Sequence, residues 1–143
     1  TGSLSRVLWA ISVADTGTAK RLLDAAEKEG ANRYFVALDR AMIALLEGEL
    51  DDARVNLDKV DPARAQGPMY VNITGLSQLL AVARGSEADF GDIDTALQSF
   101  SDFRFAGSPL SSLKKGLRCL NRLGPDYEEV FRHLEHTPGN ARL

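Results

Sequence analysis

The sequence contains very little cysteine, and this scarcity excludes several kinds of protein. Cys119 is the only cysteine in 143 residues, so neither an internal disulfide framework nor a cysteine zinc cluster can form. A chain with one thiol is typical of a reducing compartment. We therefore expect a cytoplasmic protein.

Long apolar runs and a surplus of positive charge are also missing. The apolar run at 79–83 ends at Arg84, and no apolar run approaches the roughly 18 residues that a membrane span needs. No basic leader followed by an apolar core opens the chain, which argues against a signal peptide. The net charge of −3 gives no general attraction to nucleic acid or anionic lipid. We expect no membrane span and no direct contact with nucleic acid.

Length and composition fit a single folded domain. The chain is 44% hydrophobic and 26% charged, which is ordinary for a globular protein and argues against disorder. At 143 residues it can bury a continuous core without disulfides or metals. The first residue is Thr1 rather than methionine, so this single domain (1–143) is also compatible with a piece of a longer protein.

The most informative pattern present is an apolar triplet that recurs along the chain. Its members are spaced i, i+4, i+7, which places them on one face of a helix. The copies are displaced by 34, 40 and 37 residues in turn. They are Ala19, Leu23 and Ala26; Ala53, Leu57 and Val60; Ile93, Leu97 and Phe100; and Val130, Leu134 and Thr137. A unit that repeats at this length is typical of a helical array, in which each unit buries its apolar face against a neighbour.

The periodicity predicts eight helices arranged as four hairpins. We expect them at about 4–14, 19–28, 34–46, 50–60, 70–83, 93–100, 108–123 and 126–136. No segment alternates with the period of two that a half-buried strand shows. A closed four-helix bundle would have fewer and longer helices. In the first helix we place Leu4, Val7, Leu8 and Ile11 on the buried side, with Trp9 as a candidate for the same side.

The second unit resembles a tetratricopeptide repeat. That family has a small residue in its first helix, a glycine in its turn, an alanine opening its second helix and a proline closing the unit. The matching positions are Ala41, Gly48, Ala53 and Pro62. The first unit has Ala19 after a shortened turn. The fourth keeps the turn glycine but has valine in place of alanine, and the third departs most. The divergence leaves open a related, irregular helical-repeat superfamily.

The resemblance implies an all-α, right-handed superhelix (a solenoid) of about four helix-turn-helix repeats. The first helix of each repeat would line a concave groove. Proteins of this family are typically scaffolds that bind peptides or other domains, or regulatory arms of larger bacterial proteins, including transcriptional regulators. A fold alone does not determine function.

Residues that could carry chemistry are few, and we expect neither enzymatic activity nor a cofactor. His133 and His136 are three residues apart, but no His-Glu-x-x-His pattern or cysteine accompanies them, so a metal site is not expected. Cys119 has basic neighbours that could lower a thiol pKa, but no histidine is near it in sequence. The serines at 108, 111 and 112 lie outside any Gly-x-Ser-x-Gly motif.

The candidate binding residues lie mainly on the seventh predicted helix. This segment carries four cations and no acid, and Lys114, Arg118 and Arg122 are spaced i, i+4, i+8, opposite a stripe formed by Leu110, Leu113, Leu117 and Leu120. With Asn121 beside it, this basic ridge suits a carboxylate or a phosphate. The null hypothesis is an ordinary solvated helix face. Further predicted groove residues are Tyr34, Leu38, Met42 and Asn72.

The leading functional hypothesis is a non-catalytic protein–protein interaction module that binds a peptide or partner domain in a concave groove. Residues 1–100 hold ten basic and fifteen acidic residues, whereas residues 101–143 hold seven and five, so an acidic partner would suit the basic ridge. The alternative is a regulatory or oligomerisation arm of a larger bacterial transcriptional regulator, which would pack against sister domains, for example as a homodimer, or sense a ligand. An enzyme is the third alternative.

Overall fold

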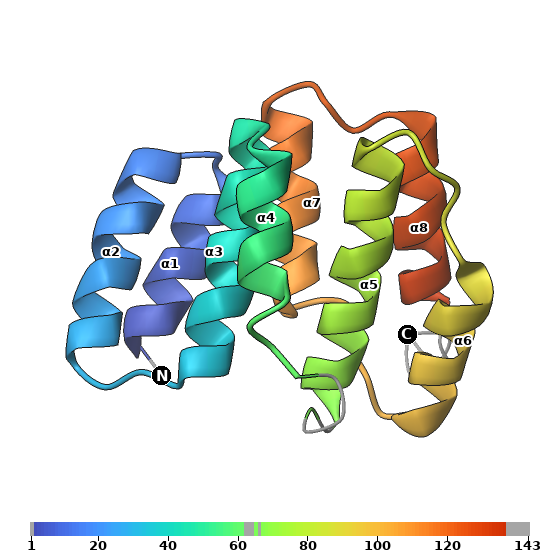
Figure 1. Cartoon of the computed structure of the whole chain (residues 1–143), viewed down its shortest axis with the longest axis horizontal. Helices are drawn as coiled ribbons and strands as arrows, with labels where there is room; N and C mark the ends of the chain where they lie inside the picture. The colour runs from blue at the N-terminus through green and yellow to red at the C-terminus, as the bar shows by residue number, and fades with distance from the viewer. Residues whose placement is uncertain (1, 62–64, 66, 137–143) are drawn as a thin grey trace.

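The computed structural model describes residues 2–61, 65 and 67–136, and within them every regular element is a helix. The helices are α1 (Gly2–Ser12), α2 (Thr16–Lys28), α3 (Arg33–Glu47), α4 (Leu50–Leu57), α5 (Pro68–Ala83), α6 (Phe90–Ser99), α7 (Pro109–Cys119) and α8 (Pro125–Glu135) (Figure 1). The predicted all-α class is confirmed. In this part of the chain, no helix is both long and apolar enough to cross a membrane.

Side-chain caps determine where several helices begin. The Asp15 carboxylate accepts a hydrogen bond from the Thr18 backbone N–H at 3.1 Å, so α2 begins at Thr16, earlier than its apolar pattern predicts. The Asn32 side chain caps α3 in the same way, accepting from the Tyr34 N–H at 2.8 Å. At the other end of α3, Gly48 has a φ of +76°, a left-handed conformation that glycine adopts without strain.

The repeated apolar triplet lies in the core. Leu23, Leu57, Leu97 and Leu134, the central residues of the four copies, all have exposed fractions of 8% or less. Phe100 is half-buried and Thr137 lies outside the described residues. The sequence therefore predicted these core positions on the even-numbered helices correctly. Phe103 and Phe105, which precede α7, are also buried in the core.

Truncation of Leu57 tests the importance of these positions. Leu57 is 2% exposed on the short helix α4, and the Leu57→Ala change leaves a cavity there. We expect the free energy of unfolding to fall by about 2–5 kcal/mol, measured by urea denaturation. The exposed Val55, on the same helix, offers the control Val55→Ala, which should change stability by about 0.5 kcal/mol or less. Equal effects of the two substitutions would contradict the burial described here.

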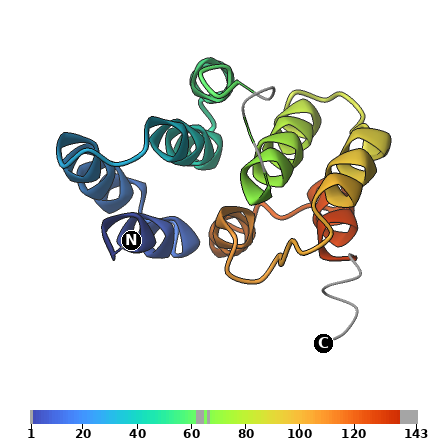
Figure 2. The same cartoon turned by 90° about the horizontal axis from the view of Figure 1, so that it is seen from below.

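The first six helices pack in chain order, but α7 and α8 do not continue the series. Consecutive helices contact each other from α1 to α6. Helix α7 instead returns to pack against α1, α3 and α5, whereas α8 packs against α5 and α6 (Figure 2). The prediction that the last two helices form a fourth hairpin is therefore wrong.

Two glycines explain how α7 and α8 approach their neighbours so closely. Gly116 of α7 lies directly against the backbone carbonyl of Ile11 in α1, with no space for a β-carbon. Gly75 of α5 lies beneath the side chains of Leu110 and Leu134, from α7 and α8. Close backbone approach through glycine thus joins elements that are far apart in the sequence.

Candidate partner-binding site

Lys114, the first residue of the predicted basic ridge, is engaged in an ion pair within the fold. Its ammonium Nζ lies 2.6 Å from Glu135 Oε1 of α8, and its side chain is only 21% exposed. The same Nζ lies 5.9 Å and 5.8 Å from the ring centroids of Phe105 and Phe131. Lys114 therefore ties α7 to α8, and its charge is already neutralised by a carboxylate.

Arg122 is also occupied within the fold. Its guanidinium donates to the backbone carbonyl of Leu46 at 2.5 Å and to that of Leu45 at 3.3 Å. Both carbonyls belong to the last turn of α3, where helical i+4 partners run out, and that of Leu45 also accepts from the Gly48 backbone N–H at 3.1 Å. Arg122 therefore stabilises the C-terminus of α3, and sequence spacing alone could not reveal this contact.

The remaining ridge residues are exposed. Arg118 and Asn121 both lie on the surface, together with Lys115, which lies outside the i, i+4, i+8 series. Asn121 has a φ of +56° in the turn after α7, a left-handed conformation that asparagine tolerates better than most residues. The structure thus keeps Arg118 and Asn121 available to a partner.

Three of the four other predicted groove residues are inaccessible. Leu38 and Met42 are completely buried, because α3 is surrounded by α1, α2, α4, α5 and α7. Asn72 is 2% exposed and its amide donates to the Pro68 carbonyl at 2.7 Å, while its Oδ1 has no hydrogen-bond partner. A partner could not reach these side chains without opening the core, so their assignment to a groove is wrong.

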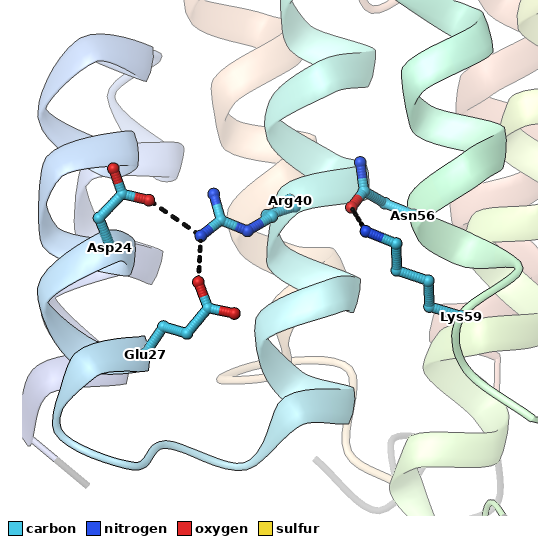
Figure 3. A network of polar contacts seen from close by, with 5 residues as sticks. All are labelled: Asp24, Glu27, Arg40, Asn56 and Lys59. Atoms are coloured by element: carbon cyan, nitrogen blue, oxygen red, sulfur yellow. Dashed lines mark hydrogen bonds and ion pairs between the residues drawn. The ribbon is translucent and has the colours of Figure 1, made fainter.

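Tyr34, the fourth, does line a groove, which runs along α3 between α2 and α4. The floor is a stripe of α3 residues spaced four and three apart: Arg33, Ala37, Arg40, Ala44 and Glu47. Two adjoining cavities of about 360 and 210 Å³ make up the groove, and Arg40 and Asn56 line both. Figure 3 shows Arg40 between the α2 carboxylates on one side and, on the other, Asn56 of α4 and Lys59, which follows α4.

An ion-pair network fixes the α2 side of this groove. One nitrogen of Arg40, Nη2, lies 2.9 Å from Asp24 Oδ1 and 2.8 Å from Glu27 Oε1. Burial lowers the pKa of the Arg40 guanidinium, but its hydrogen bonds and attraction to the two carboxylates outweigh burial and hold that pKa above its usual value. Lys20 and Glu47, 2.8 Å apart, join α2 to α3 at the other end of the groove.

The end of the groove near the N-terminus of α3 carries unneutralised positive charge. Arg33 stacks over the Tyr34 ring with its guanidinium carbon 5.1 Å from the centroid, and it donates to the Tyr34 hydroxyl at 3.3 Å. Lys59 donates to Asn56 Oδ1 at 3.3 Å. Within the described residues, neither Arg33 nor Lys59 pairs with a carboxylate. This end of the groove can therefore attract an acidic group.

The other chemical candidates are dispersed. His133 stacks on Phe90 with centroids 4.2 Å apart and has Nδ1 3.5 Å from Asp94 Oδ1, whereas His136 contacts the Arg132 carbonyl. Across the described ranges, no three histidine, cysteine, aspartate or glutamate side chains are grouped to hold a metal. Cys119 is exposed, and its Sγ lies 3.6 Å from the Ser12 carbonyl oxygen.

Comparisons with known proteins leave the candidate site to be interpreted from its own geometry. No protein-family model, curated protein or solved structure matches the chain. The groove residues other than Tyr34 were not predicted from the sequence. The regular spacing of small and charged residues on α3 was a usable signal, since it repeats at helical intervals within an otherwise apolar helix.

Proposed function

We propose that this protein is a non-catalytic protein-interaction module that binds a segment of a partner protein in the groove over α3. The observation that carries the proposal is the continuous floor of this groove. Ala37 and Ala44 alternate with charged residues along it, so a partner backbone can approach α3 closely between polar anchors. At 15 residues, α3 offers a floor about 22 Å long.

The charges along the groove favour one kind of segment. At one end, Arg33 and Lys59 have no carboxylate partner among the described residues, whereas the other end holds Glu47 and Asp52. A partner segment with an acidic residue at the Arg33 end would therefore be attracted and oriented. Because Arg40 is held by two carboxylates, that wall needs little reorganisation on binding, which limits the entropy lost.

The same proposal includes a divergent helical-repeat architecture related to tetratricopeptide repeats. The chain-order packing of α1 to α6 supports a superhelical array over this part, and the return of α7 to α1 makes the array irregular at its end. The right-handed twist in this proposal follows from the family resemblance alone. The one cysteine, exposed and unpaired, supports a cytoplasmic location, where thiols stay reduced.

Selection of peptides and charge reversal in the groove test this function. Random peptides displayed on phage are selected for binding to the wild-type protein. The selected peptides are then synthesised, and their dissociation constants are measured. Peptides that occupy the groove should bind the Arg33→Glu/Lys59→Glu variant about tenfold more weakly or worse, because two attractive contacts become repulsive.

A matched control separates this effect from a change in net charge. Arg21→Glu/Lys28→Glu reverses one arginine and one lysine at exposed positions of α2 that do not line the groove. This variant should bind the selected peptides like the wild type. Equal weakening of both variants, or no peptide sensitive to the groove variant, would contradict the proposed function.

A further inference from the structure

Helices α1 and α7 form a surface without acidic residues. Neither α1 nor α7 contains an aspartate or a glutamate, although the chain has 20 of them, and none occurs between Asp102 and Asp126. The exposed cations here are Arg6 on α1 and Lys115 and Arg118 on α7. This face is therefore positively charged within a protein whose net charge is −3.

The same face carries large apolar side chains in contact with water. Trp9 is 61% exposed, Val13 is 45% exposed and Leu120 is 39% exposed. Trp9 had been a candidate for the buried side of its helix, and Leu120 for the buried leucine stripe, so both expectations are wrong. Val13 directly follows α1, four residues after Trp9, and its backbone N–H donates to the Trp9 carbonyl at 3.3 Å.

Two contacts hold α7 against α1. Gly116 of α7 lies against the Ile11 carbonyl of α1, and Cys119 Sγ lies 3.6 Å from the Ser12 carbonyl oxygen. Trp9 is one turn before Ser12, whose hydroxyl donates to the Trp9 carbonyl at 2.6 Å. Figure 2 shows α1 and α7 side by side along the edge of the molecule away from α4.

The last residues of α1 and α7, Ser12 and Cys119, contact each other, so the two helices end at the same level. Lys115 is one turn before Cys119 on α7, and Arg118 immediately precedes it. Val13 follows the end of α1 and Leu120 follows the end of α7, beside the contact between Ser12 and Cys119. Trp9, Val13 and Leu120 are thus exposed apolar residues on or directly after these two packed helices, and Lys115 and Arg118 are exposed cations on α7.

We propose that this α1–α7 face is a second docking surface, and that its occupant is an acidic amphipathic segment of a partner protein. Apolar residues of the segment would cover Trp9 and Val13, while its carboxylates would pair with Arg6, Lys115 and Arg118. Tryptophan and arginine are the residue types most enriched among those that dominate binding energy. The absence of acids on both helices favours a negatively charged partner through electrostatic complementarity. This surface is separate from the groove over α3.

The protein itself provides a probe for the test, because Trp9 is its only tryptophan. The ligand is a synthetic helix-forming peptide with leucines along one face and glutamates on the others. Its binding should shift the Trp9 emission to shorter wavelength and protect the indole from acrylamide quenching. A peptide with lysines in place of the glutamates should have no effect, and binding of the acidic peptide should weaken as salt rises.

Matched variants show whether the proposed residues are responsible. With a dye-labelled peptide followed by fluorescence anisotropy, we expect Trp9→Ala and Lys115→Glu/Arg118→Glu each to raise the dissociation constant about tenfold or more. All three side chains are exposed, so these variants should fold like the wild type, as circular dichroism would verify. Arg21→Glu/Lys28→Glu should bind the peptide normally.

Several outcomes would overturn the proposal. The proposal would be wrong if Trp9 emission stayed unchanged at a saturating concentration of the acidic peptide. It would also be wrong if the lysine peptide bound as tightly as the acidic peptide. If Trp9 emission instead depended on protein concentration, and sedimentation showed a dimer lost in Trp9→Ala, the face would be a contact between two copies. Retained binding in Arg33→Glu/Lys59→Glu is expected, so failure here and failure of the groove proposal are distinguishable.

Discussion

Replacing Gly116 with alanine should strongly destabilise the protein and separate α7 from α1. The added β-carbon would overlap the backbone carbonyl oxygen of Ile11 and lie 3.2 Å from Leu46 Cδ2. A backbone atom cannot rotate away as a side chain can, so the two helices must move apart. We expect the free energy of unfolding to fall by about 3 kcal/mol, measured by urea denaturation followed by circular dichroism.

A second glycine provides the control for this substitution. Gly17 lies in helix α2, and the nearest atom to an added β-carbon there is the flexible end of Arg21, 3.8 Å away. Gly17→Ala should leave stability unchanged or raise it by about 1 kcal/mol, because alanine is the better helix former. If Gly116→Ala unfolded at the same urea concentration as the wild type, the close packing of α7 on α1 would be contradicted.

Asp39 should make the stability of the protein fall as the pH rises from acid to neutral. This residue lies in the central helix α3 and is only 2% exposed, and burial raises the pKa of its carboxyl to about 8. In the unfolded chain the same carboxyl has an ordinary pKa near 4. Between these values the unfolded chain releases a proton that the folded protein retains, so increasing pH favours unfolding.

The Asp39→Asn variant isolates this contribution. The asparagine cannot ionise, so the stability of the wild type relative to the variant should fall by about 1.4 kcal/mol per pH unit between about pH 4 and pH 8. By pH 7 the relative loss should total about 4 kcal/mol, and above pH 8 it should level off. Urea denaturation of both proteins at a series of pH values measures the difference.

The control replaces an exposed carboxyl in the same way. Asp102→Asn removes one charge from a surface position and should follow the pH dependence of the wild type. If the stabilities of wild type and Asp39→Asn changed in parallel across the whole range, Asp39 would not be buried as described.

Helix content and many of the core positions could be predicted from the sequence. The triplet around Leu57 recurs at helical spacing, and its central leucines proved to be buried in all four copies. These core positions could be predicted because hydrogen bonds between residues four apart hold a helix. The buried face of a helix therefore appears in the sequence as a local pattern of apolar residues. Helix boundaries were less exact, since Asp15 extends α2 through a cap that the apolar pattern does not contain.

The exposure of the candidate binding residues could be predicted only in part. Tyr34 and Arg118 are accessible, as expected, but Leu38 and Met42 are buried because α3 became the central helix of the fold. When a helix is apolar on most of its sides, the sequence predicts that other elements will surround that helix. The sequence does not show which helices those will be. Asp39 lies within such a stretch, and its burial follows from that position rather than from any motif.

By itself, the sequence determined that the described part of the chain folds into eight helices and many of the positions that they bury. Only the tertiary structure decided that α7 packs on α1, that Lys114 and Arg122 are engaged within the fold, and that Trp9 remains in water. The reason is physical. Helical periodicity is a short-range property, whereas the choice between apolar faces depends on shape at residues such as Gly116, more than a hundred positions from the backbone it contacts.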